Sequence, residues 1–145
     1  MNFNNLESLY RSVIMDHYKH PRNKGTLESG TLSIDMNNPT CGDEIQLNLE
    51  VEDGIIKDVK FNGHGCSISM ASASMMSEAV KGEPVERALE MSDEFSKMML
   101  GEDYTIDDDM GDAEALSGVS QFPARIKCAT LSWKALEKGF KDAHE

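Results

Sequence analysis

Basic residues are scarce in this chain, and their shortage excludes two classes of partner. Its 145 residues include 14 Lys and Arg against 26 Asp and Glu, which gives a formal net charge of −12. Nucleic acids and anionic membrane surfaces are polyanions that select basic patches, so neither is expected to bind. The acidic surface instead suits a partner with a basic docking face, or serves only to keep the protein solvated.

Long apolar runs are also missing. No stretch approaches the ~20 residues that a transmembrane helix needs. Residues 1–7 have neither the basic start nor the apolar centre of a secretory signal, so we expect a cytoplasmic protein. The length, with 39% hydrophobic and 28% charged residues, predicts one globular domain over residues 1–145.

Hydrophobic periodicity predicts a mixture of helices and an antiparallel sheet. Residues 4–19 carry apolar side chains at helical spacing. Three strands follow in which apolar and polar residues alternate, as in a sheet with one face in water. The pair Asp53-Gly54 predicts a tight hairpin between the second and third strands. Further helices are predicted over about 67–80, with Pro84 in the first turn of the next one, and over about 129–141.

The most acidic segment, residues 101–118, shows no periodicity and is interpreted as a loop or lid. Asp107 and Asp109 begin a stretch that resembles a calcium-binding EF-hand loop. The resemblance fails further on, because the required glycine falls on Asp112 and the required glutamate on Gly118. Calcium binding is therefore not expected.

Only three cysteines are present, an odd number that favours metal ligands or reactive thiols over disulfides in a cytosolic chain. The alternative is that each is a small buried hydrophobe. Cys41 lies on the turn between the first two strands, where Gly42 permits unusual backbone angles. Cys66 follows the third strand. Because antiparallel strands reverse direction, Cys41, Asp43 and Cys66 should meet at one edge of the sheet, and a helix start near Cys128 could be aimed there.

Three thiolates and one carboxylate can complete a tetrahedral metal site. Such a set suits zinc or an iron–sulfur cluster. Structural zinc sites usually contain only Cys and His, so the carboxylate of Asp43 favours a working site with an exchangeable ligand. His64 is a weaker candidate ligand, better interpreted as packing or bonding to the turn. His17 and His20 are expected to provide charge at a helix end or a surface contact.

At this point several motifs resemble the IscU-like family of iron–sulfur cluster assembly proteins, which includes the NifU N-terminal domain. The resemblance covers nearly the whole chain. The matching motifs are Asp16-His17-Tyr18, Pro21-Arg22-Asn23, Asn38-Pro39-Thr40-Cys41-Gly42-Asp43, Gly63-x-Gly65-Cys66-Ser67-Ile68-Ser69-x-Ala71-Ser72 and Phe122-Pro123-x-Arg125-x-Lys127-Cys128-Ala129.

Two features resemble the zinc-dependent sulfurtransferase branch of that family. Scaffold members carry a histidine immediately before the third cysteine, where this chain has Lys127. The branch also carries an insertion between the second and third cysteines, which the acidic segment at about 101–118 resembles. The resemblance implies an α+β fold in which about five helices pack on a three-stranded antiparallel sheet.

The resemblance also implies a function. Zinc would be bound by four residues, Cys41, Asp43, Cys66 and Cys128. Cys41 would accept persulfide sulfur from a PLP-dependent cysteine desulfurase of the SufS type, and a downstream iron–sulfur scaffold would receive it. Arg125 and Lys127 are candidate supporting residues, and the protein is expected to be a monomer. Two alternatives stay open at this stage, an iron–sulfur cluster scaffold and a zinc-stabilised interaction module without chemistry.

Overall fold

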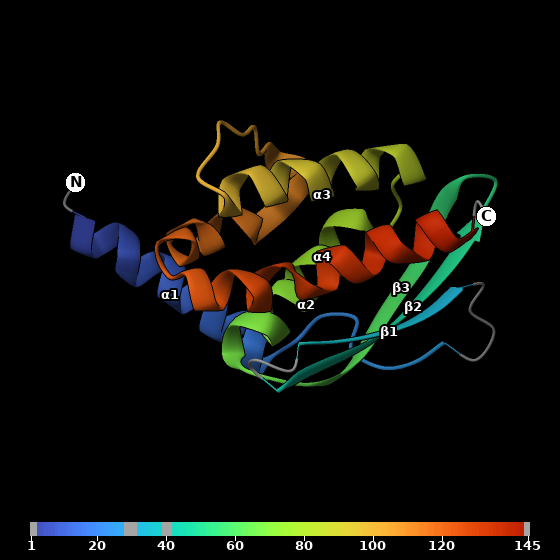
Figure 1. The fold of residues 1–145 in the computed structure, drawn as a ribbon, viewed down its shortest axis with the longest axis horizontal. Helices are drawn as coiled ribbons and strands as arrows, with labels where there is room; N and C mark the ends of the chain where they lie inside the picture. The colour runs from blue at the N-terminus through green and yellow to red at the C-terminus, as the bar shows by residue number, and fades with distance from the viewer. Residues whose placement is uncertain (1–2, 28–31, 39–41, 144–145) are drawn as a thin grey trace.

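The computed structural model describes residues 3–27, 32–38 and 42–143. Their fold is α+β, as the sequence and the family resemblance predict (Figure 1). In chain order the elements are α1 (Phe3–Lys19), β1 (Leu32–Asn38), β2 (Asp43–Glu52), β3 (Ile55–His64), α2 (Ser67–Val80), α3 (Val85–Met99), the 3-10 helical segment η1 (Asp108–Gln121) and α4 (Pro123–Ala143). None of the described helices combines the length and apolar content needed to cross a membrane.

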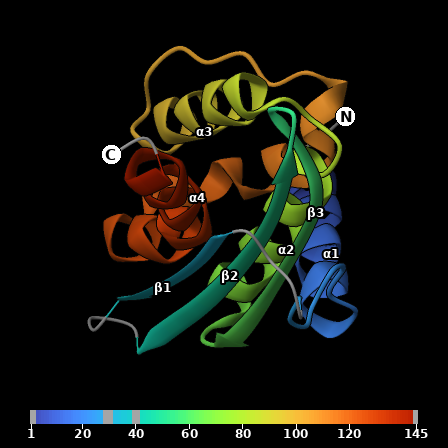
Figure 2. The same ribbon diagram turned by 90° about the vertical axis from the view of Figure 1, so that its right-hand side faces the viewer.

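The three strands form one antiparallel sheet in the order β1-β2-β3. Alternation in the sequence decides which face is covered, because successive side chains of a strand point to opposite sides. Ile45, Leu47 and Leu49 of β2 are fully buried, whereas Glu44, the second residue of the strand, is exposed on the opposite face. Helices α2 and α4 pack on the buried face, and none of the described helices covers the other face (Figure 2).

Tight turns set the register of the sheet. Asp53 and Gly54 both adopt left-handed backbone angles, with φ of 56° and 77°, as the predicted β2–β3 hairpin requires. Gly42 has φ of 71° just before β2, which confirms the need for glycine there. The register pairs Asn38 with Asp43, so the end of β1 and the start of β2 lie side by side.

The central element of the helical layer is α2. Small side chains, mostly Ala and Ser, let neighbouring helices approach it closely, and α1, α4 and η1 all contact it. A helix that is buried almost all round must satisfy its polar groups internally. Accordingly, the hydroxyl of Ser72 donates to the main-chain oxygen of Ala129 in α4. This packing fixes the start of α2, and with it Cys66, relative to α4.

Helix α4 begins six residues earlier than predicted. The sequence led us to expect its start near Ala129, but Pro123 is its first residue. Proline suits this position because its missing N–H is not needed in the first turn of a helix. Cys128 therefore lies in the second turn, fully buried, and not at the helix start. By contrast, Pro84 directly precedes α3 and does not lie in its first turn.

The prediction of a loop or lid over residues 101–118 is wrong from Asp108 onward. The segment folds into η1, whose apolar side chains Met110, Ala113 and Leu116 are buried against the helical layer. Gly111 adopts φ of 58° and kinks the segment. Tight 3-10 turns interrupted by a kink do not repeat every 3.6 residues, so the pattern was not visible in the sequence.

Candidate metal centre

Three of the four predicted metal ligands come together at one edge of the sheet. A carboxylate oxygen of Asp43 and the sulfurs of Cys66 and Cys128 all lie within 4.8 Å of one another. They come from the first residue of β2, the residue before α2 and the second turn of α4. The convergence follows the hairpin argument made from the sequence. Cys41 lies outside the described residues, so its assignment as a ligand stays a prediction.

Asp43 is the most informative member of this cluster. It is fully buried, and its Oδ1 accepts a hydrogen bond of 2.9 Å from the main-chain N–H of Cys66. Within the described part of the chain, its Oδ2 is buried and has no hydrogen-bond partner. Burying an unsatisfied carboxylate oxygen is costly unless a cation balances it. The residues present therefore fit a bound metal ion.

Gly65 lets the chain approach Asp43 closely. A Cβ atom at this position would collide with Oδ1 of Asp43 and Oγ of Ser69. The neighbouring N–H of Cys66 can reach the carboxylate only because this space is free of a side chain. Ser69 Oγ donates to the Cys66 main-chain oxygen at 3.0 Å and lies 3.7 Å from the Cys66 sulfur. The loop that carries Cys66 is thus held from both sides.

Cys128 has a polar neighbour that the sequence analysis did not identify. The side-chain amide of Asn38 lies 4.0 Å from the Cys128 sulfur, at the limit of an N–H···S hydrogen bond, and both residues are buried. Asn38 also pairs with Asp43 across the sheet. In the sequence, the contact of Asn38 with Cys128 was signalled only by the position of Asn38 in the family motif that contains Cys41. Cys66 is only partly buried, so the cluster is most accessible from its side.

The other candidate residues lie at the margin of the cluster. Arg125 and Lys127 are exposed on the first turns of α4, with Lys127 directly before Cys128. Their supporting roles stay predictions. His64 is 72% exposed and lies 3.9 Å from Glu44, and it is not a member of the described ligand cluster. This placement agrees with its weaker candidacy as a ligand, but its exposure shows that the expectation of packing was wrong.

The expectation that His17 would serve as helix-end charge or surface contact is wrong. Its ring is fully buried, with Nδ1 2.8 Å from the hydroxyl of Ser74 in α2 and Nε2 2.9 Å from Oδ2 of Asp112 in η1. The error follows from the missed helical segment, because η1 supplies Asp112, whose hydrogen bond compensates for burying the polar ring. His20 is exposed, as expected.

Arg22 and Asn23, which belong to the family motif that follows His17, anchor the end of α1 to α2. The main-chain N–H of Arg22 donates to Ser74 Oγ at 2.9 Å, and the Asn23 amide donates to Ser77 Oγ at 3.1 Å. The Arg22 guanidinium donates to Asp16 at 2.7 Å. This hydrogen bond lowers the pKa of Asp16 and raises the pKa of Arg22. These residues hold the fold together and take no part in the metal cluster.

With this fold and cluster in place, comparison with known proteins identifies the class. The chain belongs to the family of the NifU-like N-terminal domain, whose model matches residues 9–129 and so includes all four predicted ligands. This confirms the resemblance drawn from the motifs.

Among its relatives, the chain is 64% identical over 140 residues to the zinc-dependent sulfurtransferase SufU of Bacillus subtilis strain 168, covering 96% of this chain and 95% of that protein. It is 45% identical over 141 residues to the iron–sulfur cluster assembly scaffold protein IscU of Streptococcus pyogenes serotype M1, covering 97% and 88%. The crystal structure of the N-terminal part of a NifU-like protein from Brucella abortus shares the fold, with a TM-score of 0.86 at 18% identity over 96% of each chain.

Proposed function

We propose that this protein is a zinc-dependent sulfurtransferase that accepts persulfide sulfur from a SufS-type cysteine desulfurase and relays it to iron–sulfur cluster assembly in the cytoplasm. The observation that carries the proposal is the cluster of Asp43, Cys66 and Cys128, in which one buried oxygen of Asp43 has no hydrogen-bond partner among the described residues. The 64% identity to the Bacillus subtilis zinc-dependent sulfurtransferase supports it. Cys41, assigned from the sequence, would complete the set of four ligands.

The described residues prepare the site without large rearrangement. The N–H of Cys66 fixes one oxygen of Asp43, and the other oxygen stays buried without a hydrogen-bond partner among the described residues. Asn38 lies against the sulfur of Cys128, which the rigid helix α4 holds in place. Bound zinc would keep the cysteine ligands deprotonated at neutral pH. With zinc bound, the site would hold its cysteines as thiolates. Cys128 on α4 is buried, and the site can be reached from the side of the partly buried Cys66.

The proposed sulfur step uses Cys41. Its thiolate attacks the outer sulfur of the desulfurase persulfide, and a new S–S bond forms at Cys41. The S–S bond to the desulfurase cysteine breaks, and that cysteine leaves as a thiolate. The exchange needs no oxidant or reductant, because one persulfide replaces another. We expect a monomer that forms a transient complex with the desulfurase and then delivers sulfur to a downstream scaffold.

An iron–sulfur cluster scaffold is the second candidate. It is favoured by the convergence of Asp43, Cys66 and Cys128 and by the 45% identity to the Streptococcus pyogenes scaffold protein. Lys127 argues against it, because scaffold members of the family carry a histidine at this position, and a lysine ammonium cannot replace its imidazole as a ligand.

Metal analysis of the aerobically purified protein separates these candidates from one another. The sulfurtransferase should contain about one zinc per chain and no iron. Iron together with inorganic sulfide would favour the scaffold. Incubation with the desulfurase and cysteine should then raise the mass of the zinc protein by one sulfur atom, and a protein that binds zinc without gaining sulfur would fit the interaction module instead.

A further inference from the structure

A groove runs along the outer edge of β1 toward the metal centre. It consists of two adjoining pockets of about 440 and 180 Å³ that share Met36 and Asn37 of β1. Lys138 of α4 lines the larger pocket, and Lys127 and Lys134 line the smaller one. We call this feature the β1–α4 groove. Its inner end is Asn38, the residue next to the Cys128 sulfur. Whatever occupies the groove therefore ends beside the proposed sulfur-transfer site.

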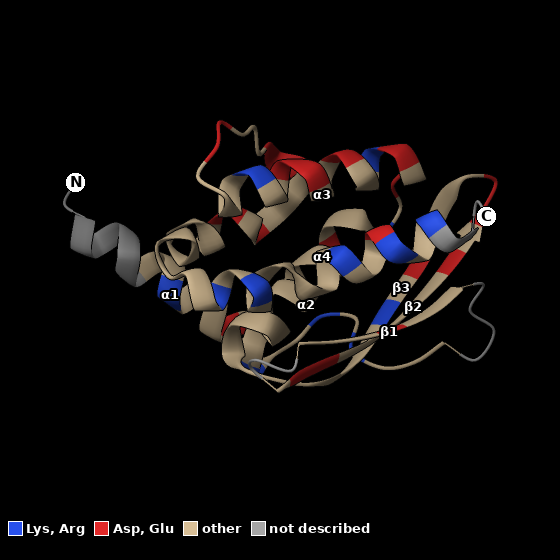
Figure 3. Cartoon of the chain, in the orientation of Figure 1, with Lys and Arg blue, Asp and Glu red and all other residues tan. Residues whose placement is uncertain are grey.

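The α4 side of the groove is positively charged, although the protein as a whole is strongly acidic. Lys127, Lys134 and Lys138 are all exposed and are spaced by seven and four residues, which places them on one face of the helix. Lys127 and Lys138 form no ion pair with any other described residue, and Lys134 lies 3.4 Å from Glu137. Figure 3 shows basic residues along α4 and acidic ones along the neighbouring α3. These lysines are therefore available to an acidic ligand.

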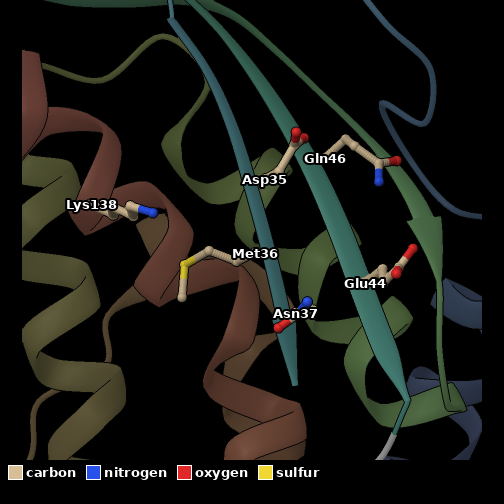
Figure 4. Close-up of a pocket in the computed structure, with 6 residues that line it drawn as sticks. All are labelled: Asp35, Met36, Asn37, Glu44, Gln46 and Lys138. Atoms are coloured by element: carbon tan, nitrogen blue, oxygen red, sulfur yellow. The ribbon is translucent and has the colours of Figure 1, made fainter. Parts of the chain in front are cut away.

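The opposite side of the groove carries the other charge. Figure 4 shows Lys138 and Met36 directed toward each other, while Glu44 and Gln46 point away from α4. Asp35 and Glu44 are exposed on the open face of the sheet. An occupant must therefore present acidic groups toward α4 and basic or neutral groups toward this face, because like charges placed opposite one another are destabilising.

The backbone of β1 adds a second requirement. Among the described strands, β1 pairs with β2 alone and is therefore an edge strand of the sheet. Alternate residues of an edge strand direct their N–H and C=O groups outward, where an extended segment can pair with them. The side chains of a strand added there would alternate between the two faces. The edge and the charges thus select the same kind of occupant, an extended segment with alternating charge.

We propose that the β1–α4 groove docks an extended segment of the cysteine desulfurase, with acidic side chains facing α4 and basic or neutral ones facing the open side of the sheet. This inference rests on the proposed function and adds to it a docking surface and its chemistry. The segment would seat the desulfurase with its persulfide at the end of the groove, next to the ligand cluster.

Charge reversal tests the proposal with a matched control. The groove variant carries Lys134→Glu and Lys138→Glu. The control variant carries Lys57→Glu and Lys60→Glu on β3, away from the groove, and has the same net charge. Binding of a SufS-type desulfurase is measured by calorimetry. The groove variant should bind at least about tenfold more weakly than the unaltered protein, and the control variant less than about twofold. Zinc content should be the same in all three proteins.

Hydrogen exchange supplies a readout that surface charge alone would not change. In the complex, amides of alternate residues of β1 should exchange more slowly than in the free protein. Equal weakening by the two variants, unchanged binding of the groove variant, or β1 amides that are no slower in the complex would each overturn the docking proposal. Slow β1 amides in concentrated protein without desulfurase would point to a second copy of this chain and would also overturn it.

The two proposals fail in different ways. If the unaltered protein binds the desulfurase and gains sulfur while the groove variant does so equally well, only the docking surface is wrong. If the unaltered protein neither binds the desulfurase nor gains sulfur, the proposed function is wrong and the docking proposal falls with it.

Discussion

The described residues form two clusters in which a metal ion could find three ligands, and these clusters differ in one decisive way. Asp43, Cys66 and Cys128 form the first, and His17, Glu78 and Asp112 form the second. In each cluster, one ligand atom from every residue lies within 4.8 Å of the other two. In the second, Nε2 of the His17 ring meets Asp112 at 2.9 Å, a hydrogen-bond distance, and Nδ1 meets the hydroxyl of Ser74.

The difference lies in what is left unsatisfied. The two carboxylates of the second cluster are about half exposed, so water can solvate them. In the first cluster the carboxylate is fully buried and keeps one oxygen without a described partner. Proximity alone therefore does not define a metal site, and a buried ligand atom without a partner is the stronger indication. We interpret the second cluster as a structural tie between α1, α2 and η1.

Removing one carboxylate from each cluster tests most directly whether only the first cluster binds zinc. Asp43→Ala should weaken zinc binding at least about 100-fold, since even the loss of an outer partner of a ligand costs about 10–100-fold. Asp112→Ala should leave zinc affinity unchanged. A chelator competition assay measures both. Equal zinc affinities in the two variants would contradict the assignment of Asp43 as a ligand.

Removing the proposed sulfur acceptor should separate transfer from metal binding. Cys41→Ala should abolish the stimulation of alanine formation by the desulfurase, because no thiolate remains to attack the persulfide. The fold should survive as long as zinc stays bound to the other three ligands, which circular dichroism and metal analysis can check. Full stimulation by this variant would exclude Cys41 as the acceptor.

Disrupting the structural tie at His17 should lower the stability of the fold and leave zinc binding unchanged. His17→Ala leaves a cavity and removes two hydrogen bonds from a fully buried ring, so the free energy of unfolding should fall by about 2–4 kcal/mol. His20→Ala at the exposed end of the same segment should change it by less than about 0.5 kcal/mol. Urea denaturation compares the two. Loss of zinc from His17→Ala protein that remains folded would show that the second cluster has a metal-related role after all.

The smallest expected effect is on acid stability and concerns the ion pair between Asp16 and Arg22. Hydrogen bonding to Arg22 lowers the pKa of Asp16 below its ordinary value of 3.8. The unfolded chain therefore binds more protons in this range, so the pair stabilises the fold above about pH 4, and this contribution is lost as the pH falls through the lowered pKa. In Asp16→Asn protein, the loss of stability on acidification below pH 4 should be shallower. Identical acid unfolding curves would show that the pair contributes nothing.

The sequence was sufficient for those parts of the site that depend on local rules. Alternation gave the strands, Asp53-Gly54 gave the hairpin, and strand reversal then brought Asp43 and Cys66 to one edge. The position of Cys128 was harder, because it depends on how α4 packs on α2. Its helix begins at Pro123, and the tertiary contact through Ser72 is what directs it to the cluster.

Two other features could not be read from the sequence for a similar reason. The partner of His17 is Asp112, which lies far along the chain in a segment without helical periodicity. The contact of Asn38 with Cys128 joins the end of a strand to a helix. Both depend on distant elements meeting, and neither leaves a repeating pattern in the residues themselves.

The spacing of the ligands along the chain has a consequence for how the protein could release one of them. Asp43, Cys66 and Cys128 belong to β2, the start of α2 and α4, so an ion held by these three would close two long loops and act as a cross-link between distant parts of the fold. Cys41 is only two residues from Asp43 and closes no loop of its own. Its departure from the ion would free a reactive sulfur while the cross-link stays intact.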